Sequence, residues 1–112
     1  INVQRKLLEV IMAYVKLGKV NEIPEGSGKM YEIDDRWIGV FNVNGELNAI
    51  DDICSHQEAF LHEGELDNYE IECNAHGAKF DIRTGKVCNG PAVTPIQSYS
   101  VRIVKGSFEV NI

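Results

Sequence analysis

Two short motifs constrain this chain more than any other feature of its sequence. Cys54 and His56 form a Cys-x-His motif, Cys73 and His76 form a Cys-x-x-His motif, and 16 residues separate the two. Thiolate and imidazole are ligands of zinc, copper and iron–sulfur centres, so two of each complete a set of ligands for a metal centre. Ordinary buried thiols and histidines are a weaker explanation, because two of the three cysteines stand beside two of the three histidines. We therefore expect two loops that together hold a metal.

The distribution of the ligands distinguishes between two kinds of metal centre. Structural zinc sites usually combine a closely spaced pair of cysteines with a closely spaced pair of histidines, whereas here each segment brings one of each. In a [2Fe–2S] centre of mixed ligation, one iron takes two cysteines and the other takes two histidines. Cys54 and Cys73 would then share one iron, and His56 and His76 the other. The spacing favours this dinuclear cluster, and zinc stays the alternative.

The composition is that of one acidic globular domain. The chain has 112 residues, of which 44% are apolar, and its 11 basic and 17 acidic residues give a net charge of −6. This charge repels phosphate backbones and anionic lipid surfaces, so we expect neither nucleic-acid nor membrane partners. No apolar run approaches the roughly 20 residues of a membrane-spanning helix, and no secretory signal is expected. An odd number of cysteines argues against a disulfide scaffold and favours a reducing, cytoplasmic location.

Strand and turn signals dominate the chain after its first dozen residues. Residues 1–12 carry no recognisable chemistry, and we expect them to be an extension outside a domain that spans residues 13–112. Asn44-Gly45 is a strong hairpin signal, because both central residues of a type I′ turn need positive φ. Further hairpin turns are expected at Thr84-Gly85 and Lys105-Gly106-Ser107, and the polar pair Asp34-Asp35 separates two more strand-like runs. Short antiparallel strands joined by such turns predict an all-β domain.

The ligand motifs and their surroundings resemble those of Rieske-type ferredoxins. The similarity covers nearly everything from Ala13 to the C-terminus, and besides the ligands it is carried by Leu61, Gly64, Gly77, Phe80-Asp81, Thr84-Gly85 and Gly90-Pro91-Ala92. The resemblance implies a Rieske-like fold of stacked antiparallel sheets with a small two-loop cluster-binding subdomain. It also implies a Rieske-type [2Fe–2S] cluster held by the four motif residues. Asn74 departs from the family, which usually has proline directly after the second cysteine; this could change loop rigidity but removes no ligand.

The resemblance also bears on the reduction potential. Rieske domains of respiratory cytochrome bc complexes clamp their two loops with a disulfide, but the matching positions here are Ala59 and Ala75. High-potential members carry a serine and a tyrosine where this chain has Ala78 and Phe80, so two hydroxyl donors toward sulfur are missing. Such donors stabilise the more negative, reduced cluster, and six acidic residues between the motifs disfavour the reduced cluster as well. We expect a potential near the low end of the Rieske range.

These observations predict a soluble one-electron carrier, with no catalytic residue and no small-molecule substrate of its own. Its partners would be redox proteins, namely a reductase, a terminal oxidoreductase or both. One alternative is a Rieske component or small subunit of an oxygenase or nitrite-reductase system. The second alternative is a zinc-binding structural or interaction module.

Four residues outside the motifs carry structural expectations only. His62 lies between the motifs without a paired cysteine, and we expect it to be an exposed loop histidine. Cys88 follows a strand-like run and is expected to be a small buried side chain. Trp37 and Phe41 fall on one alternating face of a predicted strand, which predicts that both belong to the core.

Overall fold

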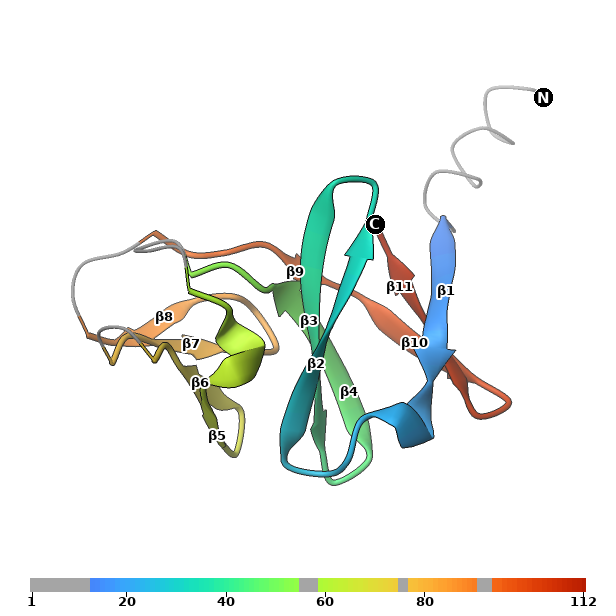
Figure 1. Cartoon of the computed structure of the whole chain (residues 1–112), viewed down its shortest axis with the longest axis horizontal. Coiled ribbons are helices and arrows are strands. Elements are labelled where there is room, and N and C mark those ends of the chain that lie inside the picture. The colour runs from blue at the N-terminus through green and yellow to red at the C-terminus, as the bar shows by residue number, and fades with distance from the viewer. Residues whose placement is uncertain (1–12, 55–58, 75–76, 91–93) are drawn as a thin grey trace.

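Three antiparallel β-sheets make up the described part of the chain (Figure 1). The structure is a computed structural model that describes residues 13–54, 59–74, 77–90 and 94–112. The strand orders are β1-β11-β10, β2-β3-β4-β9 and β5-β6-β7-β8. The strands are β1 (Tyr14–Lys19), β2 (Ser27–Ile33), β3 (Arg36–Val43), β4 (Glu46–Asp51), β5 (Glu65–Asp67), β6 (Glu70–Glu72), β7 (Lys79–Asp81), β8 (Val87–Asn89), β9 (Ser98–Tyr99), β10 (Val101–Val104) and β11 (Ser107–Asn111). Two short 3-10 helices, η1 (Val20–Glu22) and η2 (Leu61–Glu63), are the only helical segments among the described residues.

The sheets lie in sequence along the molecule. The β2-β3-β4-β9 sheet occupies the middle, with the β5–β8 sheet at one end and the β1-β11-β10 sheet at the other (Figure 1). This arrangement confirms the predicted all-β fold of stacked antiparallel sheets. No helix in the described ranges has the length and apolar character needed to cross a membrane. Residues 1–12 lie outside the described residues, so the domain boundary at residue 13 stays a prediction.

The predicted turns join the strands of consecutive hairpins. Asn44 and Gly45 both have positive φ, at 53° and 90°, as the type I′ turn between β3 and β4 requires. The turn at Asp34-Asp35 between β2 and β3 and the turn at Lys105-Gly106 between β10 and β11 also place both residues at positive φ. Primed turns match the twist of the flanking strands, so these local signals were sufficient to predict the hairpins.

Two apolar cores lie on opposite faces of the middle sheet. The cysteine core consists of Phe41, Val43, Ile50, Cys54, Leu61, Ile71, Cys73, Ala78, Phe80 and Ile82. The base core consists of Ile23, Ile38, Val40, Leu47, Ala49, Phe108 and Val110. Successive side chains of a strand point to opposite faces, so Phe41 enters the cysteine core while its neighbour Val40 enters the base core. The middle sheet is therefore a rigid support, buried on both sides, for the end of the molecule that carries the cysteines.

Two of the predicted core residues are exposed instead. Phe41 is fully buried, as expected, but Trp37 is 38% exposed at the start of β3, where its indole N–H donates to Glu32. Cys88 is exposed as well. Its neighbour Val87 packs against the cysteine core, and the two-residue period of a strand then turns Cys88 outward.

Candidate metal centre

The two motif cysteines lie in the same apolar core. Cys54 is 2% exposed, Cys73 is 1% exposed, and neither forms a disulfide. Both belong to the cysteine core, together with Ala78 and Phe80. The fold thus brings together two thiols that are 19 positions apart in the sequence, as ligation of one iron by both would require.

Each cysteine begins a loop, and the two loops close in the same way. The amide of Cys54 donates to the carbonyl oxygen of Ala59 at 2.9 Å, and the amide of Cys73 donates to the carbonyl oxygen of Ala78 at 2.7 Å. The second loop is tightened further, because Gly77 adopts a φ of 72° and donates to the carbonyl oxygen of Cys73. Two backbone-closed loops, each starting at a buried cysteine, therefore form the candidate site.

The predicted histidine ligands, His56 and His76, lie outside the described residues. By sequence position, each belongs to one of the two closed loops. The described residues by themselves hold no group of three or more metal-ligating side chains. That His56 and His76 complete the ligand set stays a prediction. Two buried thiols with one imidazole in each loop fit the donor set of a mixed-ligand iron–sulfur cluster. The same donor set also suits zinc chemically.

The surroundings of the cysteines are apolar. Ala78 and Phe80, which stand where high-potential Rieske proteins carry a serine and a tyrosine, are both fully buried within the cysteine core. Neither side chain has a hydroxyl that could donate toward a sulfur atom. Among the acidic residues between the motifs, Glu63, Glu65, Asp67 and Glu70 are exposed, and salt therefore screens their charges. The missing hydroxyls therefore support the prediction of a low potential more strongly than the surface acids do.

A buried carboxylate lies directly before the first loop, and sequence analysis did not identify it. Asp52 is fully buried, and its two carboxylate oxygens meet the backbone amide of His62 at 2.7 Å and the ring Nδ1 of His62 at 2.5 Å. Burial raises the pKa of the Asp52 carboxyl, and the hydrogen bonds from His62 oppose that shift. The expectation that His62 is an exposed loop residue was wrong, because its side chain is only 24% exposed and pairs with Asp52.

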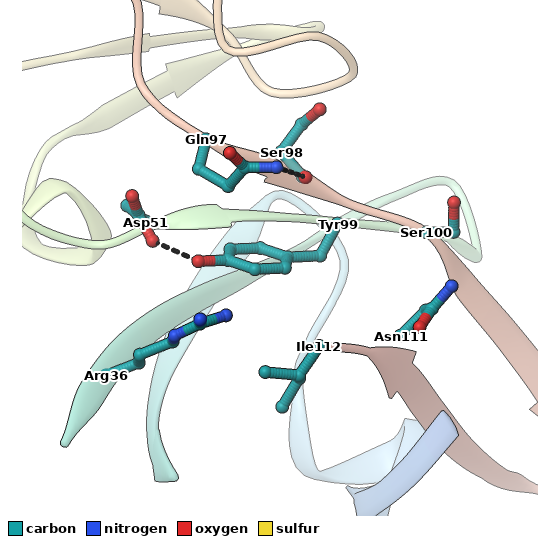
Figure 2. A pocket seen from close by; sticks show the side chains of 8 residues that line it. All are labelled: Arg36, Asp51, Gln97, Ser98, Tyr99, Ser100, Asn111 and Ile112. Atoms are coloured by element: carbon teal, nitrogen blue, oxygen red, sulfur yellow. Dashed lines mark hydrogen bonds between the residues drawn. The ribbon is translucent and has the colours of Figure 1, made fainter. Parts of the chain in front are cut away.

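A polar hollow beside β9 is lined by residues other than the cysteines. Figure 2 shows this polar hollow of about 640 Å³, in which Arg36, Asp51 and Tyr99 lie together. The Tyr99 hydroxyl donates to Asp51 at 2.6 Å, and burial together with this carboxylate raises the pKa of Tyr99 to about 12. The Asp51 amide also donates to the carbonyl oxygen of Gln97. These contacts hold β9 against the end of β4, from which the first ligand loop leaves.

Comparison with known proteins decides between the two kinds of metal centre. The family model of the Rieske [2Fe-2S] domain matches residues 13–100, which is most of the chain. The chain belongs to the Rieske [2Fe-2S] family. Its centre is therefore a Rieske-type [2Fe–2S] cluster, and the zinc alternative is not supported.

Relatives of known role are electron-transfer components. The chain is 47% identical over 76 residues to the ferredoxin component of the p-cumate 2,3-dioxygenase system of Pseudomonas putida, covering 67% of this chain and 64% of that protein. It is 40% identical over 93 residues to the biphenyl dioxygenase ferredoxin subunit of Pseudomonas sp. strain KKS102, covering 82% and 85%. The chain thus spans just under two-thirds of the first relative and most of the second.

A solved ferredoxin has the same fold. The ferredoxin of carbazole 1,9a-dioxygenase from Nocardioides aromaticivorans IC177 superposes with a TM-score of 0.83 at 29% identity, covering 87% of this chain and 95% of that one. The predicted resemblance to Rieske-type ferredoxins is thereby confirmed. The chain is therefore similar to ferredoxins of dioxygenase systems.

Proposed function

We propose that this Rieske chain is the one-electron carrier of a multicomponent oxygenase system, taking its electron from a reductase and delivering it to a terminal oxygenase. The observation that carries the proposal is the pair of buried cysteines in one core, each opening a closed loop with one histidine. Two relatives are ferredoxin components of dioxygenase systems. A structural neighbour is a complex of reduced oxygenase and oxidised ferredoxin, with a TM-score of 0.80 at 28% identity. The two ferredoxin relatives and the oxygenase–ferredoxin complex support an oxygenase as the electron acceptor.

In this proposal the four motif residues divide between the two irons. Cys54 and Cys73 hold one iron as thiolates, and His56 and His76 hold the other as neutral imidazoles. The cluster, when bound, supplies a one-electron couple whose net charge changes from about zero to −1. The chain keeps the cysteines in an apolar core and closes both loops with backbone hydrogen bonds, so the ligands stay in place when the charge changes. The absence of hydroxyls at positions 78 and 80 supports a potential at the low end of the Rieske range.

We base the proposed cellular compartment on the oxidation state of the three cysteines. None of the three forms a disulfide, and one of them, Cys88, is exposed. Exposed thiols persist in a reducing compartment, which supports a cytoplasmic location.

The proposed function predicts a defined spectroscopic result. The purified protein should be coloured, contain about two irons and two sulfides per chain, and take up one electron from dithionite. Its reduced EPR spectrum should show an average g below that of all-cysteine [2Fe–2S] proteins, because two of the ligands are histidines. After removal of excess dithionite, each chain should reduce one equivalent of cytochrome c, used as an artificial acceptor. Colourless protein without iron, or an EPR spectrum of the all-cysteine type, would contradict the assignment.

A further inference from the structure

The short helix η2 follows the first ligand loop and is hydrogen-bonded to Asp52, two residues before that loop begins. The Leu61 amide donates to the carbonyl oxygen of Asp52 at 2.6 Å, and the His62 amide donates to a carboxylate oxygen of the same residue at 2.7 Å. The ring of His62 contacts the other carboxylate oxygen. Next to these contacts, Ile53 and Phe60 form an antiparallel bridge. Asp52 therefore holds η2 against the segment from which the first ligand loop leaves.

The other end of η2 lies against the strand that leads into the second ligand loop. Gly64 ends η2, and a Cβ placed there would collide with the carbonyl oxygen of Glu72, the residue before Cys73. Only glycine allows the two backbones to approach so closely. On the inner side, Leu61 is fully buried in the cysteine core. η2 therefore lies between the two segments that lead into the ligand loops.

One side chain of the second ligand loop reaches across to η2. The Asn74 amide nitrogen donates to the carbonyl oxygen of Glu63 at 3.0 Å. Proline, which the resemblance leads one to expect here, has no side-chain amide that could make this bond. The positions that match the disulfide of the respiratory proteins are Ala59 and Ala75, which cannot crosslink the loops. The hydrogen bond from Asn74 to Glu63 thus connects the second ligand loop to η2 without a covalent crosslink.

We propose that Asn74, Glu63 and the Asp52–His62 pair form one link through η2 that fixes the two ligand loops relative to each other. Asn74 attaches the link to the second loop, and Asp52 attaches it to the first. Asn74, Asp52 and His62 are positioning residues in this view, since they act through the loops and not on the cluster. A neutral hydrogen bond contributes little to global stability, but this one opposes separation of the ligands directly. The inference rests on the proposed ligand assignment.

Replacing Asn74 in the cluster-loaded protein tests the link. Asn74→Ala removes the donor, and Asn74→Asp keeps the shape of the side chain without an N–H group. Both should accelerate the loss of visible absorbance in the presence of an iron chelator by about two- to tenfold, the range that one hydrogen bond allows. Asn48→Ala is the matched control, because Asn48 makes a comparable surface hydrogen bond to Glu46, outside the site. Its rate of cluster loss should equal that of wild type.

The EPR line width provides a readout that a merely structural role would not change. If Asn74 fixes the loops, both Asn74 variants should show broader lines from a wider spread of cluster geometries, with an unchanged urea midpoint for the sheets. Unchanged line widths together with unchanged rates of cluster loss would overturn the proposal. A wild-type protein without a cluster would instead contradict the proposed function, so the two failures are distinguishable.

A double variant tests whether the contacts act in series. His62→Ala removes the ring contact to Asp52, and His62→Gln restores an amide donor there. His62→Ala weakens the end of the link at Asp52, where the amides of Leu61 and His62 still donate, whereas Asn74→Ala releases the other end completely. If one link passes through η2, weakening the first end adds nothing once the second end is released. The double variant with His62→Ala and Asn74→Ala should then lose its cluster no faster than the faster single variant, and His62→Gln should slow the loss relative to His62→Ala. Multiplication of the two single effects in the double variant would overturn the serial link.

Discussion

Replacing Cys54 or Cys73 by serine should abolish the visible absorbance and the iron content of the purified protein. A serine hydroxyl stays protonated near neutral pH and is a poor substitute for a thiolate ligand. Because metal binding contributes to the folding free energy, both variants should also unfold at lower temperature than the wild type. The measurements are iron and sulfide per chain, the EPR spectrum of the reduced protein and the thermal midpoint.

The third cysteine of the chain provides the matched control for this prediction. Cys88 is exposed on β8 and does not belong to the cysteine core, so Cys88→Ser should keep the cluster and the thermal midpoint. Full cluster content in either buried-cysteine variant would refute the ligand assignment. Loss of the cluster in Cys88→Ser would show that the exposed thiol has a role that its position does not explain.

Introducing hydroxyls at positions 78 and 80 should raise the reduction potential. Both side chains are fully buried with Cys54 and Cys73, so new donors at these positions would act in a medium of low polarity. A hydrogen bond that is stronger in the reduced state by about 1.4 kcal/mol raises a one-electron potential by about 60 mV. We expect Ala78→Ser and Phe80→Tyr each to raise the potential by tens of millivolts, and the double variant to raise it further. Direct electrochemistry at fixed pH and ionic strength measures the change.

A buried phenylalanine in the other core separates the effect of the hydroxyl from that of a disturbed core. Phe108 is also fully buried, but it lies in the base core on the opposite face of the middle sheet. Phe108→Tyr should lower the free energy of unfolding, because it buries a hydroxyl group in an apolar core. It should leave the reduction potential unchanged. If Ala78→Ser and Phe80→Tyr leave the potential where it is, these side chains do not face the sulfur atoms.

Sequence analysis predicted the turns and the family well, whereas the assignment of the four ligands stays a prediction. A type I′ turn depends on two adjacent residues with positive φ, so Asn44-Gly45 specifies its hairpin without help from the rest of the chain. The pairing of one cysteine with one histidine in each motif is likewise local, and it was sufficient to indicate the family. Alternation along β3 also predicted the burial of Phe41.

Predictions about three single side chains failed, because the surrounding structure decides how far each side chain is buried. His62 looked like a loop residue because nothing adjacent to it in the sequence pairs with it, yet it contacts Asp52, ten positions away. Cys88 looked apolar enough to be buried, but the strand period at Val87 turns it outward. Trp37 has the right alternation for the core but lies at the start of β3, where its side chain is only partly covered.

The sequence by itself determined the family, the hairpins and the all-β class, because these depend on the chemistry and backbone preferences of residues close together in the chain. Only the tertiary structure decided that Cys54 and Cys73 share one core, that Asp52 is buried against His62 and that Asn74 reaches Glu63. These contacts join segments that are 10 to 19 positions apart. Their formation depends on how the sheets pack, and local sequence patterns do not encode that packing.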